Sequence, residues 1–182
     1  IEGRIKFWEE IYGQPGKTPI HLYTRSDACG AAETWAAFLG GHQEDLKGIA
    51  IYGDPGLAEA VRQDPTGLGF NNLNFAYHPE TGRPHPGLAI GPLDLDGNGQ
   101  LTPEENFYGQ RDELTLAISR GLYPSPPARK LYLVVKKPVQ QTLVRDFLLW
   151  VLDQGQQYAA EAGYLALDQN MAQTEKQKLL KN

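Results

Sequence analysis

Short β-type runs alternate with helical patterns along this chain, and this alternation limits the fold more than any other feature of the sequence. Four apolar runs, bounded by Pro, Gly or Asp, predict strands at Ile20–Thr24, Gly48–Tyr52, Gly67–Leu73 and Lys130–Val135. Strands that alternate with helices favour an α/β architecture with at least some parallel pairing. We therefore expect a sheet flanked by helices.

Four segments carry helical signals. They are Ala31–Leu39, which ends at a Gly-Gly pair; Pro55–Gln63, with Asp54 as its expected N-cap; Val139–Ala162; and Met171–Leu180. The third segment repeats apolar residues on one face, which indicates a buried stripe. The last is polar and rich in Lys and Gln, and is typical of a surface helix or a frayed end.

Composition excludes several classes of function. The chain has 182 residues, a net charge of -5 and no cluster of Lys and Arg, so a nucleic-acid surface is not expected. One cysteine excludes an intrachain disulfide and a zinc site built from several thiolates. No apolar stretch approaches the roughly 18 residues of a membrane span, and the first residues do not resemble a signal peptide, although one that was removed would leave no trace.

The segment from Tyr77 to Tyr108 interrupts the alternation of strands and helices. It is rich in Gly and Pro and is longer than an ordinary connection, which favours an insertion with a purpose of its own. Within it, Asp94–Glu105 follows the spacing of an EF-hand loop, with a Gly at position 6 and a Glu at position 12. The spacing predicts calcium as a cofactor, with these residues as ligands: Asp94, Asp96, Asn98, Gln100 through its carbonyl, Thr102 and Glu105.

The surroundings of this loop differ from those of a paired calcium sensor. Pro84, Pro86 and Pro92 exclude a regular entering helix, whereas Pro103 fits the start of an exiting one. A lone loop of this kind favours a structural role for calcium over a signalling role. The alternative is an Asp- and Gly-rich turn that binds no metal.

A second candidate site lies where the first predicted strand runs directly into a helix. Free backbone N–H groups at a helix start attract anions, and Arg25 adds a guanidinium fork suited to phosphate or carboxylate oxygens. The alternative is that Arg25 and Asp27 simply pair with each other. The candidate ligand-binding residues are Arg25, Ser26, Asp27, Cys29, Gly30 and Ala31.

This turn and several other segments resemble the periplasmic phosphate-binding proteins of ABC transporters. The family opens the helix with R-x-D-G-S-G-T, and the sequence here reads RSDACGA. In the same order along the chain, further segments resemble family motifs: GRIKFWEEI, YGDPGLAEAVRQDPTGLGF, LYPSPPARKLYLVVKK and VRDFLLWVLDQGQQYAAEAGYLAL. The resemblance covers almost the whole chain.

Two departures from the family turn weaken the expected phosphate contacts. The serine of the family falls on Cys29 and its threonine on Ala31, so two hydroxyl donors are weakened or lost. Each hydrogen bond to a charged acceptor contributes about 1.5–3 kcal/mol. We therefore expect a lower phosphate affinity or a different oxyanion, with Asp27 orienting Arg25.

The resemblance implies a type II periplasmic-binding-protein lobe, a mixed sheet flanked by helices, in a periplasmic or other extracytoplasmic location. Residues 1–135 would form the anion-binding lobe with the calcium loop inserted at about 77–108, and residues 136–182 would be helices that return toward an absent first lobe. On this alignment IEGR, which also matches a protease site of expression linkers, is native sequence. An uncovered face between the lobes predicts a homodimer of this chain.

The function that this resemblance implies is a solute-binding component of an ABC-type importer, which takes phosphate or a related oxyanion and meets the transporter's membrane subunits. The alternative is a calcium-stabilised structural or adhesion-type module that has kept the fold and lost transport. An enzyme is not expected. Cys29 has no histidine in a recognised catalytic spacing, although a thiol at a helix start is the setting of a reactive cysteine.

Overall fold

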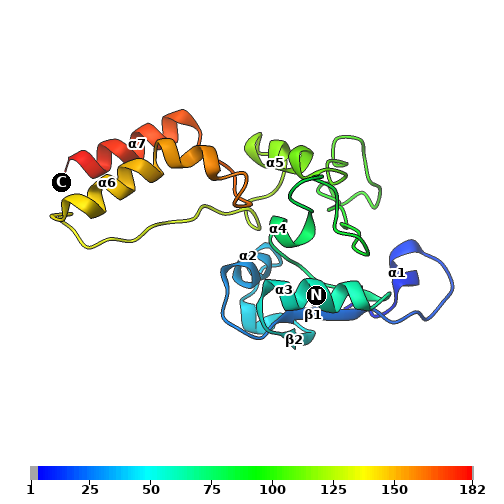
Figure 1. Ribbon diagram of the computed structural model, residues 1–182. Helices are drawn as coiled ribbons and strands as arrows, with labels where there is room; N and C mark the ends of the chain where they lie inside the picture. The colour runs from blue at the N-terminus through cyan, green and yellow to red at the C-terminus, as the bar shows by residue number, and fades with distance from the viewer. Residues whose placement is uncertain (1–3, 182) are drawn as a thin grey trace. The chain divides into compact units, whose positions relative to one another are not determined.

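The computed structural model describes residues 4–181, so the first three residues of IEGR and the final Asn182 lie outside the described residues. The chain divides into two compact units, Ile1–Arg129 and Lys130–Asn182. The described residues form an α/β structure with seven α-helices and one three-stranded parallel sheet (Figure 1). None of these helices combines the length and the hydropathy that crossing a membrane requires.

The sheet consists of β1 (His21–Arg25), β2 (Ile49–Ile51) and β3 (Gly67–Leu68) in the order β2-β1-β3. Both neighbouring pairs are parallel, and the three strands lie where the first three runs predicted them. The third predicted strand, Gly67–Leu73, was longer than the strand in the structure. The strand ends at Leu68 because the chain then turns inward to bury Phe70.

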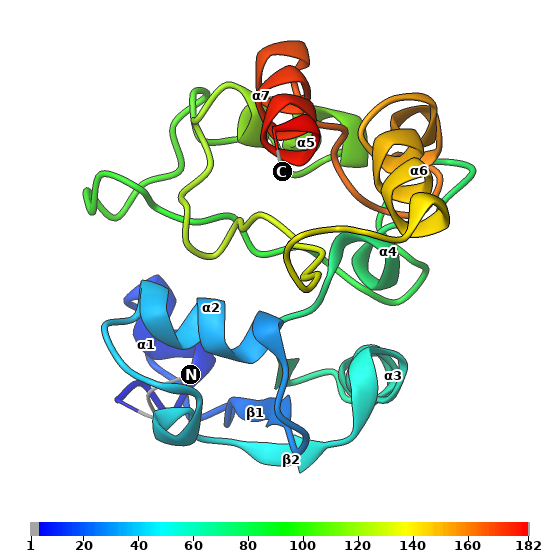
Figure 2. The same ribbon diagram turned by 90° about the vertical axis from the view of Figure 1, so that its left-hand side faces the viewer.

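Helix α2 (Gly30–Phe38) follows β1, and α3 (Gly53–Gln63) follows β2 (Figure 2). Crossovers between parallel strands are right-handed, and these two lead in opposite directions along the sheet. The two helices therefore cover opposite faces. Predicting Asp54 as the N-cap of α3 was wrong, because the helix begins at Gly53, two residues before the predicted start at Pro55, with Tyr52 as its N-cap.

The remaining helices of the first unit are short. They are α1 (Trp8–Tyr12), the 3-10 turn η1 (Gln43–Asp45), α4 (Leu73–Ala76) and α5 (Arg111–Ser119). The long segment between α4 and α5 has neither helix nor strand. It nevertheless supplies a core of its own, in which the buried ring of Tyr77 packs with Tyr108 and Leu114 and its hydroxyl donates to the Tyr108 carbonyl at 2.8 Å.

The exiting helix expected at Pro103 is absent from the described residues. Thr102 and Glu105 instead form a tight turn. The first helix after Pro103 in the described residues is α5, which begins at Arg111. The turn brings Phe107 and Tyr108 into the core around Tyr77, where the two rings stack 4.7 Å apart. Burial of these aromatic rings overrides the local helix signal.

The second unit contains α6 (Thr142–Val151), the 3-10 turn η2 (Gln154–Tyr158) and α7 (Gln169–Leu180). The single helix predicted over residues 139–162 was wrong in extent, because the chain leaves helical geometry after Leu152. The Gln156 side chain holds this break: its amide donates to the Val151 carbonyl at 2.7 Å and its oxygen accepts from the N–H of Leu167 at 2.8 Å. The last predicted helix is confirmed.

The fourth predicted strand, residues 130–135, does not form. The segment is a stretched trace leading to α6 (Figure 1), and its side chains are exposed, up to 92% for Val134. A strand needs a neighbour to pair its backbone groups, and none of residues 4–181 pairs with this segment. The apolar run alone was therefore insufficient.

Substituting Leu57 with Ala tests the core of the first unit. Leu57 is 2% exposed, so Leu57→Ala is expected to lower the free energy of unfolding by about 2–5 kcal/mol. Urea denaturation measures this loss. Leu116→Ala, at a helical leucine that is 48% exposed, is the control and should have a much smaller effect. Equal losses for the two variants would contradict the assignment of the core.

Candidate functional site

Arg25, at the carboxyl end of β1, is held between two carboxylates. Its Nε and Nη2 donate to the two oxygens of Asp27 at 2.9 and 2.5 Å, and its Nη1 donates to Asp54. Only 7% of the Arg25 side chain is exposed. The pairing with Asp27 raises the pKa of Arg25 above its already high ordinary value, so the guanidinium is permanently charged. The two-pronged contact with Asp27 also fixes its direction.

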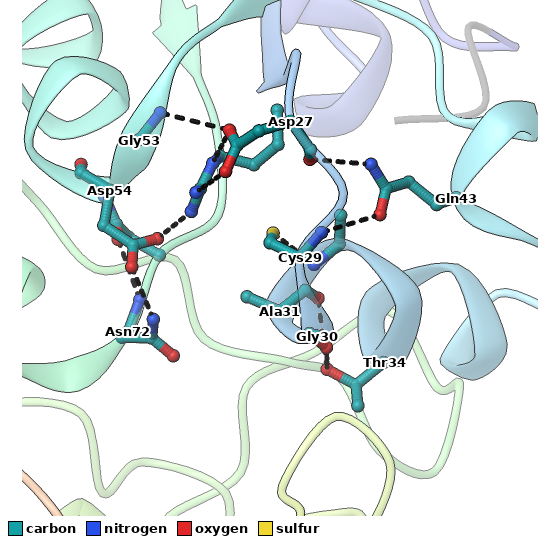
Figure 3. Close-up of polar contacts among 12 residues, drawn as sticks. Asp27, Cys29, Gly30, Ala31, Thr34, Gln43, Gly53, Asp54 and Asn72 are labelled. Atoms are coloured by element: carbon teal, nitrogen blue, oxygen red, sulfur yellow. Dashed lines mark hydrogen bonds and ion pairs between the residues drawn. The ribbon is translucent and has the colours of Figure 1, made fainter.

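The two carboxylates connect Arg25 to the rest of the sheet edge. Asp27 also accepts from the N–H of Gly53 at 3.2 Å, and Arg25 together with this contact lowers the pKa of Asp27 to about 2. Asp54 accepts from the side-chain amide of Asn72 at 2.8 Å (Figure 3). The residues that follow β1, β2 and β3 are thereby linked in one network.

The start of α2 lies beside this network (Figure 3). Cys29 is the N-cap, and its Sγ accepts from the N–H of Ala32 at 3.4 Å. Gln43 closes the loop by accepting from the N–H of Cys29 and donating to the carbonyl of Asp27. Within residues 4–181, the N–H groups of Gly30 and Ala31 have no hydrogen-bond partner.

Arg129 brings a second guanidinium to the same helix start. A Cβ built on Gly30 would lie 2.5 Å from its Cζ and 2.7 Å from its Nη2, so the cationic head rests directly against the helix end. Sequence reasoning missed Arg129 because no local pattern connects it to a turn so far away in the chain. Only the absence of a side chain at Gly30 leaves room for it.

The six predicted ligand-binding residues thus lie on one turn but do not act alike. Arg25 is paired with Asp27, as the simpler interpretation of the sequence anticipated, and Ser26 is exposed. The groups still available to an anion are the N–H donors of Gly30 and Ala31, the positive end of the helix dipole and the guanidinium of Arg129. Arg25 has further N–H groups that neither carboxylate uses.

The predicted calcium loop brings three carboxylates together. Ligand atoms of Asp94, Asp96 and Glu105 lie within 4.8 Å of one another. Gly99, at the position of the sharp turn, has a φ of +76°, which disfavours any residue with a Cβ. Oxygens at this spacing suit a hard divalent cation.

Glu105 is the buried member of this group and organises the loop. One of its oxygens accepts from the N–H of Leu95 at 2.6 Å, and the other accepts from the N–H and hydroxyl of Thr102 at 3.0 and 2.8 Å. The backbone bonds from Thr102 and Leu95 lower the pKa of Glu105 to about 2. The carboxylate is therefore charged at neutral pH.

The other predicted calcium donors contact their neighbours in the loop. The Asn98 oxygen accepts from the N–H of Gln100 at 2.7 Å, and its amide donates to Asp96 at 2.8 Å. Thr102 donates its hydroxyl to Glu105. The turn is therefore closed by hydrogen bonds in which Asp94 accepts from the N–H groups of Gly97 and Gly99.

A third polar cluster lies at the opposite end of β1. His21 Nδ1 lies 2.6 Å from Asp64, and the Tyr23 hydroxyl donates to the same oxygen at 2.9 Å. The cluster ties β1 to the chain between α3 and β3. Among the described residues no histidine hydrogen-bonds to Cys29, so the structure offers that thiol no imidazole base.

Comparison of the sequence with protein-family models and with curated proteins finds no match.

The stability of the Arg25 network is expected to depend on pH. The pKa of Asp27 is lower in the folded protein than in the unfolded chain, so its stabilising effect is complete above about pH 4 and is lost as the pH falls toward 2. Asp27→Asn should lower the melting temperature at pH 7 and flatten its decline between about pH 4 and 2. Melting curves compare it with Asp146→Asn, an exposed site on α6. Identical pH profiles would contradict this role.

Proposed function

We propose that this chain binds a small oxyanion, phosphate or a relative of it, at the start of α2. The single observation that carries the proposal is a helix start at which Arg129 lies against Gly30 and at which the N–H groups of Gly30 and Ala31 have no partner among the described residues. A helix start supplies directed donors and a positive dipole, and a guanidinium adds a planar pair of donors suited to two oxygens of one anion. Nothing in the arrangement calls for a covalent step, so a binding role is favoured over catalysis.

The location in the sheet supports the same proposal. In open sheets of parallel strands, ligands bind outside the carboxyl ends, where neighbouring strands lead to connections on opposite sides. β1 and β3 are neighbouring parallel strands, and the start of α2 and Asn72 follow their carboxyl ends. Arg25, at the carboxyl end of β1, keeps N–H groups that neither carboxylate uses, and these would supply a second set of donors.

The role in a transporter rests on the family resemblance and on the second unit. A solute-binding lobe of that family would work with a first lobe in the periplasm and deliver its anion to membrane subunits. The exposed side of α6 at Leu143 and Phe147 is a surface that such a lobe would cover. On this proposal, closure of two lobes supplies the contacts that Cys29 and Ala31 no longer make.

Calorimetric titration with phosphate, sulfate and molybdate tests the oxyanion site. We expect one tetrahedral anion to bind, and Arg129→Ala to weaken that binding about 10- to 100-fold because a charged hydrogen bond is lost. Gly30→Ala should act in the same direction, since its Cβ would displace the Arg129 head.

Gly91→Ala is the matched control for Gly30→Ala. A Cβ at Gly91 meets nothing within 4 Å, so binding should not change. If none of these anions binds to the folded protein, or if Arg129→Ala binds as tightly as the parent, the oxyanion proposal fails.

The second candidate is a calcium-stabilised structural module that has lost transport. Two observations favour it: Arg25 is already neutralised by Asp27 and Asp54, and the carboxylates of Asp94, Asp96 and Glu105 converge in a separate loop. Calcium there would replace repulsion among these carboxylates by coordination and would hold the long connection onto the core around Tyr77.

Calcium titration followed by thermal melting tests this module. The melting temperature should rise with calcium concentration, as expected when a ligand binds only the folded state. Glu105→Gln should abolish the rise, whereas Glu104→Gln, at the exposed neighbouring residue, should preserve it. A melting temperature that calcium leaves unchanged in the parent protein would exclude the metal site.

A further inference from the structure

β2 is the outermost strand of the sheet on its side. In the order β2-β1-β3 it pairs with β1 alone, and no described residue pairs with its outer edge. Ile49 is 53% exposed and Ala50 is also exposed. An uncovered strand edge presents backbone N–H and C=O groups that a further strand can pair with.

β2 is a strand that lacks a neighbour on one side, whereas the segment Leu131–Val135 has a strand-like sequence and belongs to no sheet. All five residues are apolar or aromatic, three of them (Tyr132, Val134 and Val135) have high β-propensity, and their exposed fractions run from 37% to 92%. They form a continuous apolar run rather than an alternating one, which is typical of a strand that is covered on both faces. The segment therefore lacks both a pairing partner and covering layers within the described residues.

The charges at the ends of the two segments are complementary. Leu131–Val135 is preceded by Lys130 and followed by Lys136 and Lys137. β2 is preceded by three exposed charged residues, Glu44, Asp45 and Lys47, so two negative charges and one positive charge give this approach a net charge of -1. Opposite charges on paired strands stabilise the pair, whereas two copies of Leu131–Val135 paired antiparallel would place lysines opposite each other.

We propose that Leu131–Val135 of one copy of this chain adds as a fourth strand to the outer edge of β2 in a second copy. Backbone hydrogen bonds supply the attraction, as in other cases of strand addition, and the lysines and acidic residues fix the position of the strand. The contact joins two different surfaces. If each of two copies adds its segment to β2 of the other, a closed dimer forms, and if each copy adds its segment to a new copy, a longer assembly forms.

Sedimentation velocity over a range of protein concentrations tests the association. The average mass should rise with concentration, and Val134→Pro should weaken the association about tenfold or more because proline removes a backbone donor from the added strand. Val134 is 92% exposed, so this change should leave the melting temperature of the protein unaltered. A monomer at every concentration, or association that Val134→Pro does not change, overturns the proposal.

Charge reversal identifies the two partner surfaces. One variant changes Lys130, Lys136 and Lys137 to Glu, and the other is Glu44→Lys. Each alone should self-associate about two- to fivefold more weakly than the parent, because each places like charges at the contact. A mixture of the two should recover parental association, since every contact between unlike copies is again between opposite charges.

Lys181→Glu serves as the control for this experiment. It reverses one charge in the same unit, outside both segments of the sequence, and should leave the association unchanged. If the mixture does not recover, or if Lys181→Glu weakens the association as much as the triple variant, the assembly uses another surface and the pairing of Leu131–Val135 with β2 is wrong.

Discussion

The placement of Arg25 between Asp27 and Asp54 is the interaction on which the candidate oxyanion site depends. A guanidinium that is almost entirely removed from water has to be paired, and here the pairing carboxylates come from the loop after β1 and the first turn of α3. Because Asp54 is also bonded to Asn72, beyond β3, three successive connections are fixed relative to one another. This network fixes the position of the start of α2.

Because of this network, the charged groups of this region have different roles. Arg25 is committed to two carboxylates, and this makes it better suited to positioning than to attracting an anion by itself. Among the described residues the N–H groups of Gly30 and Ala31 have no hydrogen-bond partner, and the head of Arg129 rests against Gly30. A site built from backbone donors and one arginine is less sensitive to the loss of hydroxyls at Cys29 and Ala31 than the family turn would be.

The long connection after α4 shows how a segment without helices or strands is held in place. Its aromatic residues Tyr77 and Tyr108 form a second core with α5, and the buried Glu105 carboxylate ties the loop by accepting from backbone N–H groups at both of its ends. The same carboxylate is the closing ligand in the proposed calcium site. Loop structure and metal binding would therefore share one residue, which fits a structural role for the cation.

Local patterns predicted much of the structure. β1, β2, the helices that follow them and the spacing of Asp94, Asp96 and Glu105 could be read from the sequence, because each depends on neighbours within a few residues. The errors have a common cause. The fourth strand, the helix after Pro103 and the uninterrupted helix through residue 152 were all decided by partners distant in the sequence or by the lack of them.

The sequence by itself determined the α/β character of the chain, the approximate positions of β1, β2, α2 and α7, and the spacing of Asp94, Asp96 and Glu105, since propensity and ligand spacing are local properties. Tertiary structure alone decided that Arg25 is neutralised by Asp54 as well as Asp27, that Arg129 reaches Gly30 and that residues 130–135 remain uncovered. Each of these depends on which distant side chains share a small volume, and no local pattern encodes that.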